Sequence, residues 1–473
     1  MKTLKILGVL VSLILAVAFP CWAGSDYTIY VGPPSGGDDT AMLQAALDDC
    51  MTNHPTGCTI KLSAGTYKSQ QLFGEDFHGS LKGRGMDKTV IQVLAPLEVT
   101  ADPIVEGFWS ENPPSRANKY PMLVIFMAGD ITVSNMTFRV SDYDPVMPWC
   151  FDVDCSQTAL WGFLGVIGDT SANLSIERVG FEGGPGPLAW SNHNYDDGPF
   201  FLGLSGDQPL TGTFKVVSSR IRNGEDGLLV WSVRDAHITI GGSPSDGNVV
   251  ENGALGGAYV DLDHSILEYS YNNMAVGASG GAGVLGWQCA TAIPAEPSQF
   301  LIQHNTFKAA ASWENGVWAV DFGPPMGVGK TADFVISDNT VEIASSEADP
   351  AWAGIDAVFA VGAVISNNRI SGRNVLIGIA AEGSSQCMVL GNNVQHLDAL
   401  WAPVALVTTD WGWGPMETSY CTVVGGNNKI NSYDEGTNNV LTGVNNMQGN
   451  PPGPAIKEAM KKKQELLKSL LRR

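Results

Sequence analysis

The sequence predicts an all-β solenoid of short stacked strands, and three observations support this prediction. Residues 223–240 hold an apolar run (228–233), a charged corner at Arg234 and Asp235, and a second run with period-2 alternation (236–240), which leaves no room for a helix. Related corners recur at Asp207 and Asp263, each 28 residues away. The 55 glycines and the low charged fraction of 16% suit tight corners between strands. Because a solenoid grows by adding rungs, a chain of 473 residues fits in one body.

The first 23 residues are typical of a secretory signal. Lys2 and Lys5 precede an apolar run (6–19) and the sequence Cys-Trp-Ala at 21–23, so we expect cleavage before Gly24 and export from the cytoplasm. A lipidated Cys21 is an alternative that the preceding proline disfavours. No later apolar run approaches the ~20 residues that a membrane helix needs, so the sequence predicts no transmembrane helix.

A helix is expected next, because Asp38-Asp39-Thr40 resembles a helix N-cap and residues 41–50 have apolar side chains on one side. Such a helix would cover the first rung, whose apolar side chains and backbone groups would otherwise be exposed.

Two motifs follow the expected helix: Leu-Ser-Ala-Gly-Thr-Tyr at 62–67, and Leu-Lys-Gly-Arg-Gly at 81–85 before Thr-Val-Ile at 89–91. Together with the Asp-Thr and the helix, they resemble the entry of the pectate lyase superfamily. The resemblance implies a right-handed parallel β-helix, expected here over residues 24–445.

The later rungs agree with this resemblance through residue 430. Apolar-x-apolar strands end in Asn-x-apolar at five positions, which are Asn305, Asn339, Asn368, Asn392 and Asn428. We expect these asparagines to be structural, because asparagine tolerates the left-handed conformation of a sharp corner and stacked amides bond along the coil. Their uneven spacing predicts inserted loops, where binding usually resides.

The C-terminal end is predicted to be a Pro and Gly linker (446–454) followed by a basic amphipathic helix (455–473). Three roles are open for this helix: it caps the last rung, lies on an anionic membrane surface, or docks a partner.

The cysteines are predicted to pair, because export permits disulfides. Cys50 with Cys58 and Cys150 with Cys155 would close short loops. Cys387 and Cys421 each begin a similar strand, so neighbouring rungs would bring them to about 4.8 Å, within disulfide reach.

The formal charge makes nucleic acid an improbable partner. Loss of Lys2 and Lys5 with the signal changes the charge from −21 to −23, and the last 17 residues carry seven Lys or Arg and two Glu, so the body stands at −28. An acidic exported body of this kind commonly reflects solubility and salt tolerance.

The candidate catalytic residues lie where the rare basic residues gather, since Lys215, Arg220, Arg222 and Arg234 fall within 20 positions. Lyases of this superfamily neutralise a uronate carboxylate and remove the proton at C5, and their base is an arginine. The resemblance therefore implies Arg234, or else Arg220 or Arg222, as the base, with Asp235 beside it. The acids that would hold Ca²⁺ are Asp207, Glu225, Asp226, Asp261 and Asp263. Alternatively, these acids cap corners and these arginines pair with them.

Other members of the superfamily fit less well. The Gly-His-Gly and Arg-x-Lys motifs of the hydrolases are missing, as is the Asp-Pro-His-Asp motif of alginate epimerases. His264 is the best single histidine, although a corner histidine is more often a hydrogen-bonded neighbour than a base.

Aromatic residues suggest contact with sugar rings. Trp411 and Trp413, separated by one glycine, would face the same way in an extended segment. Trp231 and Tyr259 are expected to face outward above the central rungs, and packing roles are an alternative.

The sequence thus predicts an exported polysaccharide-binding protein that could cleave a uronic-acid glycan by β-elimination. The alternative is a non-catalytic surface or envelope protein that binds glycan or protein through the same face. Fold analogy alone does not decide between them.

Overall fold

A computed structural model of the chain describes most of residues 27–461. The gaps are 95–96, 99, 101–113, 121, 141–161, 169, 184–198, 204–208, 224–226, 254–255, 277–282, 289–295, 310–313, 347–349, 411–413, 426–429, 447–452, 455 and 459–460. The predicted signal, the predicted pair Cys150–Cys155 and Asn428 therefore lie outside the described residues, as does most of the predicted C-terminal helix.

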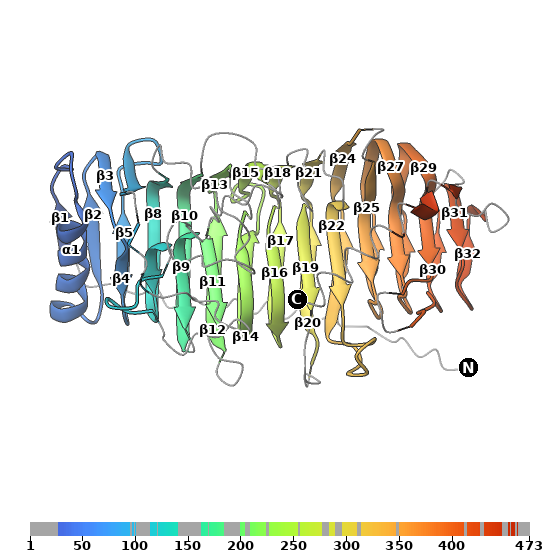
Figure 1. Ribbon diagram of the computed structural model, residues 1–473, viewed down its shortest axis with the longest axis horizontal. Helices are drawn as coiled ribbons and strands as arrows, with labels where there is room; N and C mark the ends of the chain where they lie inside the picture. The colour runs from blue at the N-terminus through green and yellow to red at the C-terminus, as the bar shows by residue number, and fades with distance from the viewer. Residues whose placement is uncertain are drawn as a thin grey trace, which may run out of the picture.

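The strands form three parallel sheets that run the length of the molecule, as Figure 1 shows for the stacked strands. The first sheet contains β4 (Leu72–Gly74), β7 (Met122–Phe126), β9 (Gly162–Gly168), β11 (Pro199–Gly203), β14 (Leu229–Gly241), β16 (Ala258–Asp263), β19 (Val284–Gln288), β22 (Glu314–Asp321), β25 (Ala351–Val358), β27 (Arg369–Glu382), β29 (Asn393–Val407), β31 (Ile430–Asp434) and β33 (Val444–Asn446).

The second sheet contains β1 (Thr28–Val31), β2 (Cys58–Leu62), β5 (Gly79–Lys82), β8 (Gly129–Arg139), β10 (Ser171–Glu182), β12 (Leu210–Val217), the later half of β14, β17 (Ile266–Ser270), β20 (Ser298–Gln303), β23 (Ala332–Ser337), β26 (Val364–Ser366), β28 (Met388–Leu390), β30 (Thr422–Val424) and β32 (Val440–Thr442). The third sheet contains β3 (Gly65–Ser69), β6 (Thr89–Val93), the later halves of β8 and β10, β13 (Arg220–Arg222), β15 (Val249–Gly253), β18 (Asn273–Val276), β21 (Thr306–Ala309), β24 (Thr340–Ala344) and the first halves of β27 and β29.

This pairing confirms the parallel β-helix that the sequence predicts. The chain passes through the first, second and third sheet in turn, and every strand pairs with its counterpart one coil away. Parallel crossovers of this kind are almost always right-handed. The core lies between the three sheets, and aromatic side chains stack there along the axis, as Phe138 does on Phe181 with ring centroids 5.6 Å apart.

A helix, α1 (Thr40–Asn53), lies at the N-terminal end of the coil (Figure 1). It buries Leu43, Ala46, Leu47 and Cys50. The predicted cap residue Asp39 is used differently from expectation, because its carboxylate accepts the backbone N–H groups of Ser35 and Lys68 and so joins neighbouring segments.

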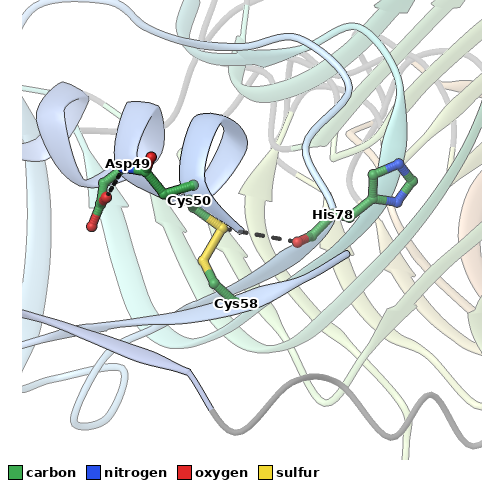
Figure 2. Close-up of a disulfide and its surroundings, with 5 residues drawn as sticks. Asp49, Cys50, Cys58 and His78 are labelled. Atoms are coloured by element: carbon green, nitrogen blue, oxygen red, sulfur yellow. Dashed lines mark hydrogen bonds between the residues drawn. A yellow bond between two sulfur atoms is a disulfide. The ribbon is translucent and has the colours of Figure 1, made fainter. Parts of the chain in front are cut away.

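The predicted disulfide between Cys50 and Cys58 is present and ties α1 to β2, with the Cα atoms 5.8 Å apart (Figure 2). The disulfide predicted between Cys387 and Cys421 is wrong, since both are buried free cysteines. The two residues do occupy the same position of successive coils, next to the pair Met388–Thr422. In-register neighbours point their side chains in parallel about 4.8 Å apart, whereas a disulfide needs the two sulfurs to turn toward each other. Instead, the Cys387 backbone N–H donates to the Cys421 Sγ at 3.3 Å.

The predicted asparagine stack is confirmed, and it is longer than expected. Six buried asparagines follow one another at the corner between the second and third sheets, and these are Asn248, Asn272, Asn305, Asn339, Asn368 and Asn392. The side-chain oxygen of Asn248 accepts from the backbone N–H of Ser219. In each later asparagine the side-chain oxygen accepts from the side-chain amide of the preceding one, as in Asn272 Nδ2 to Asn305 Oδ1 at 3.1 Å. The left-handed conformation, however, belongs to the residue before the asparagine, as at His304 with φ 57°.

Among the described residues, no helix has the length and apolar character needed to span a membrane.

Candidate functional site

The predicted basic cluster is divided between different parts of the coil. Lys215 lies on β12 in the second sheet, and Arg220 and Arg222 lie on β13 in the third. Arg234 lies where β14 passes from the first sheet to the second. The first-sheet half of β14 separates Arg222 from Arg234, so sequence proximity does not bring these guanidinium groups together.

Arg222 belongs to a row of alternating charges on the third sheet, and Arg220 lies beside this row. Arg139, Glu182, Arg222 and Glu251 occupy the same position of four successive coils. Arg222 forms an ion pair with Glu251, and the Arg220 guanidinium lies 2.9 Å from Glu182. Charges of opposite sign on neighbouring strands stabilise a sheet modestly, and this arrangement accounts for both arginines without a ligand.

Arg234 pairs with an acid on the next coil. Its Nε donates to Asp263 Oδ2 at 2.5 Å, and the two residues are in register between β14 and β16. The side chains are 40% and 35% exposed, so the pair lies at the surface.

His264 joins the same corner from the next coil. Its Nδ1 lies 2.5 Å from Asp235 Oδ1 and its Nε2 lies 3.5 Å from Glu296 Oε2. The hydrogen bond with Asp235 raises the pKa of His264 above its ordinary value, and Glu296 adds to the rise. We call Arg234, Asp235, Asp263, His264 and Glu296 the charged corner.

The backbone of this corner is left-handed at several residues with side chains. The residues are Ser232, Asp235, Asp261 and His264, with φ between 48° and 52°. The left-handed conformation is costly outside glycine, and it turns the side chains of Asp235 and His264 outward, where both are exposed at the surface.

Trp231 faces outward as predicted, whereas the same prediction for Tyr259 is wrong. Tyr259 is fully buried in the core with its ring centroid 5.9 Å from that of Tyr269, and burial raises its pKa well above the ordinary value. It pairs with Val230, the buried neighbour of Trp231, and successive residues of a strand point to opposite faces. The register instead places Trp287 two coils from Trp231 in the same outward row, with Val260 between them.

The predicted calcium ligands are only partly described. Asp261 lies at the corner, Asp263 is held by Arg234, and Asp207, Glu225 and Asp226 lie outside the described residues, as do Trp411 and Trp413. In the described part of the chain, no group of three or more His, Cys, Asp or Glu side chains could hold a metal ion.

Sequence reasoning missed two buried acids on the outer face of the first sheet. Asp356 on β25 and Glu382 at the end of β27 are 0% and 2% exposed. The indole Nε1 of Trp352 donates to both, at 3.2 Å to Asp356 and 2.8 Å to Glu382. The signal in the sequence was an acid within one long apolar run, Asp356, and an acid at the end of the next, Glu382.

No protein-family model matches the chain, and no curated protein matches it in sequence. In structure, the chain is similar to the A-module of the mannuronan C-5 epimerase AlgE6 of Azotobacter vinelandii (TM-score 0.43, 13% identity, 88% of this chain and 96% of that one). It is also similar to a mutant of the periplasmic alginate epimerase AlgG (0.44, 10%, 83% and 77%). A third similar structure is the catalytic unit of a GH87 α-1,3-glucanase from Streptomyces thermodiastaticus strain HF3-3 (0.44, 14%, 84% and 68%). At these scores and identities the similarity supports no inference about activity.

Proposed function

We propose that this protein is an exported polysaccharide-binding β-helix protein, and that the glycan lies along the edge between the first and second sheets. The observation that carries the proposal is the outward row of Trp231, Val260 and Trp287, with both tryptophans partly exposed. Coils about 4.8 Å apart put the two indoles about 10 Å apart along the axis, so an extended chain could stack a sugar ring on each. Export rests on the signal-like residues 1–23 and agrees with the Cys50–Cys58 disulfide.

The charged corner lies beside this row. Arg234 follows Trp231 by three residues on the same strand, which is about 10 Å at most. A glycan stacked on Trp231 would therefore present its polar groups to Arg234, Asp235 and His264. Rings and fixed charges together are the usual composition of a sugar-binding surface.

Binding is tested with the full mature chain against pectate, alginate, glycosaminoglycans and neutral glucans in affinity gels. We expect Trp231→Ala and Trp287→Ala each to weaken binding to the preferred glycan about tenfold, because each removes a stacking surface. Tyr420→Ala is the matched control, since Tyr420 is 63% exposed and lies elsewhere. Unchanged binding in both tryptophan variants would contradict the assigned strip.

The finer proposal is β-elimination on a uronic-acid glycan. A base removes the proton at C5, and the electron pair of the C5–H bond forms the C4–C5 double bond. The glycosidic oxygen leaves C4 and takes up a proton. The family resemblance implies Arg234 as the base. The Arg234 guanidinium already pairs with Asp263 through Nε and has further N–H donors in the fork that suits a carboxylate. We therefore assign Arg234 to the uronate carboxylate and the proton transfer to His264, which Asp235 orients.

A lyase assay follows the ultraviolet absorbance of the unsaturated product. It is run with and without Ca²⁺, since Asp207, Glu225 and Asp226, three of the predicted Ca²⁺ ligands, lie outside the described residues. If the assignment is correct, Arg234→Lys and His264→Gln lower turnover by orders of magnitude and leave the melting temperature nearly unchanged. Wild-type protein that binds a uronate but never cleaves it would leave the binding function alone.

A non-catalytic surface protein is the second candidate, and one observation favours it. Arg220, Arg222 and Arg234 each pair with a carboxylate of a neighbouring coil, as arginines with a structural role do. In that case the glycan affinity of the wild-type protein and of Arg234→Lys would be the same.

A further inference from the structure

The outer face of the first sheet carries a second apolar cluster near the C-terminal end. Its buried members come from β25, β27, β29 and β31 and include Trp352, Ala380, Trp401, Ala405 and Tyr433. Ile456, near the start of the basic C-terminal segment, packs against this cluster. The segment therefore begins along the side of the coil, over strands that precede it in the sequence.

Asp356 and Glu382 lie at this cluster and face outward. Asp356 pairs with Ala380, a member of the cluster, and its neighbours Ile355 and Ala357 point into the main core. One indole N–H, that of Trp352, is shared by the two carboxylates, so their oxygens lie within about 6 Å of each other. Two carboxylates this close and this deeply buried are stabilised by positive charge, because little water reaches them.

The chain offers one concentrated source of positive charge for this place. Lys457, Lys461, Lys462, Lys463, Lys468, Arg472 and Arg473 follow Ile456, in a body that is otherwise strongly acidic. Residues 456–458 and 461 are helical. Beneath the same surface, Trp401 is only 7% exposed and its buried indole N–H has no acceptor among the described residues, as expected if a covering segment supplies one.

We infer that the basic C-terminal segment, residues 455–473, docks on the outer face of the first sheet and that its lysines neutralise Asp356 and Glu382. As a helix the segment would be about 28 Å long, which equals about six coils of 4.8 Å. Only one coil remains beyond β31, so a helix along the axis must run toward the N-terminal end to find surface to cover. Its apolar positions Met460, Leu467 and Leu470 would continue the contact that Ile456 begins.

The test measures how fast trypsin cleaves the segment in the native, full-length mature protein, with released peptides identified by mass spectrometry. We expect protection in the wild type. In the double variant Asp356→Asn, Glu382→Gln, cleavage should be about tenfold faster or more, because breaking a buried ion pair is strongly destabilising. The control is Asp333→Asn, Glu342→Gln, two surface acids that pair with Lys330 and Lys308 on other sheets, and it should behave as the wild type.

A second variant changes only the segment and leaves the body intact. One protein carries arginine, and another glutamine, at Lys457, Lys461, Lys462 and Lys463. The arginine variant should retain protection and the glutamine variant should lose it. Cleavage is measured with a protease that does not require lysine. Equal cleavage of the wild type and every variant would overturn the inference. Protection that disappears on dilution would mean that the segment docks on a second copy of the chain, and this result would also overturn the inference.

Discussion

Two corners of the same coil differ in almost every respect. At the corner between the second and third sheets, one residue type is repeated and buried, and each asparagine bonds to the coil on either side. At the corner between the first and second sheets, the left-handed positions hold Ser232, Asp235 and His264, and the pairs formed there differ from coil to coil. Both corners require left-handed backbone, which is strained in residues other than glycine. Only at the first corner does a continuous network of buried hydrogen bonds offset this strain. Stability is concentrated at the asparagine corner, and the charged corner is left to vary.

The largest expected effect comes from breaking the asparagine stack. Asn305→Ala removes the bonds from Nδ2 to Tyr269 O and Asn339 Oδ1, and the acceptor that serves Asn272. We expect a loss of about 2–4 kcal/mol in the free energy of unfolding, because buried donors and acceptors lose their partners. Chemical denaturation measures it.

Asn393→Ala is the matched control for Asn305→Ala. Asn393 is exposed beside the stack and accepts only the backbone N–H of Gln395 among the described contacts of its side chain. A change beyond about 0.5 kcal/mol in this control, or an equal loss in both variants, would remove the distinction between buried and exposed asparagines.

A smaller effect is expected at the charged corner. Arg234→Ala breaks the pair with Asp263, but both side chains are partly exposed, so the free energy of unfolding should fall by about 1 kcal/mol or less. Denaturation in low and high salt measures the change, which should shrink as salt screens the pair. A loss as large as that of Asn305→Ala would mean that both corners carry the fold.

The pH dependence at His264 is smaller still. Because the folded-state pKa is raised by Asp235, the charged imidazole stabilises the folded protein below the ordinary value of 6.5. This contribution is lost as the pH rises through the raised pKa. Above pH 6.5 the melting temperature should therefore fall less steeply with pH in His264→Gln than in the wild type. NMR titration of the wild type should place the pKa of His264 above 6.5. An unshifted pKa would contradict the pair with Asp235.

The smallest expected effect concerns Cys387 and Cys421, which lie just after left-handed residues of the corner between the first and second sheets, at Gln386 and Tyr420. Both thiols should react only after unfolding, since both side chains are fully buried. Because no bond joins Cys387 and Cys421, a reductant should change the melting temperature only through the Cys50–Cys58 disulfide. Peptide mapping that recovers the two residues linked would restore the disulfide that the sequence predicts.

The sequence predicts the repeated part of the molecule well and the variable part poorly. Strand, corner and strand around Arg234 could be identified because alternation and a charged break depend only on adjacent residues. The asparagine stack could be identified because one residue type recurs at the same point of successive rungs. Both are local patterns that a long chain repeats many times.

The candidate site depends on relations that local patterns do not contain. Arg222 and Arg234 are close in sequence, yet they lie in different sheets, and only the path of the loop between them decides this. Tyr259 points inward because it lies in register with Val230, whose side chain is buried in the core. Asp356 and Glu382 are 26 positions apart, and stacking of β25 on β27 brings them to one indole.

The direction of the asparagine stack has a consequence for how the molecule is built. The side-chain oxygen of each asparagine serves the coil before it, so Asn272 obtains its acceptor only when the coil of Asn305 has been laid down. While the coils from Asn248 to Asn392 emerge from the ribosome, the growing chain therefore ends each time in a surface of the same chemical kind, with backbone and side-chain amide donors that the next asparagine will accept. Such a surface accepts one further coil after another with the same hydrogen bonds, as a growing polymer accepts monomers. The asparagine stack itself therefore does not determine at which coil the series ends.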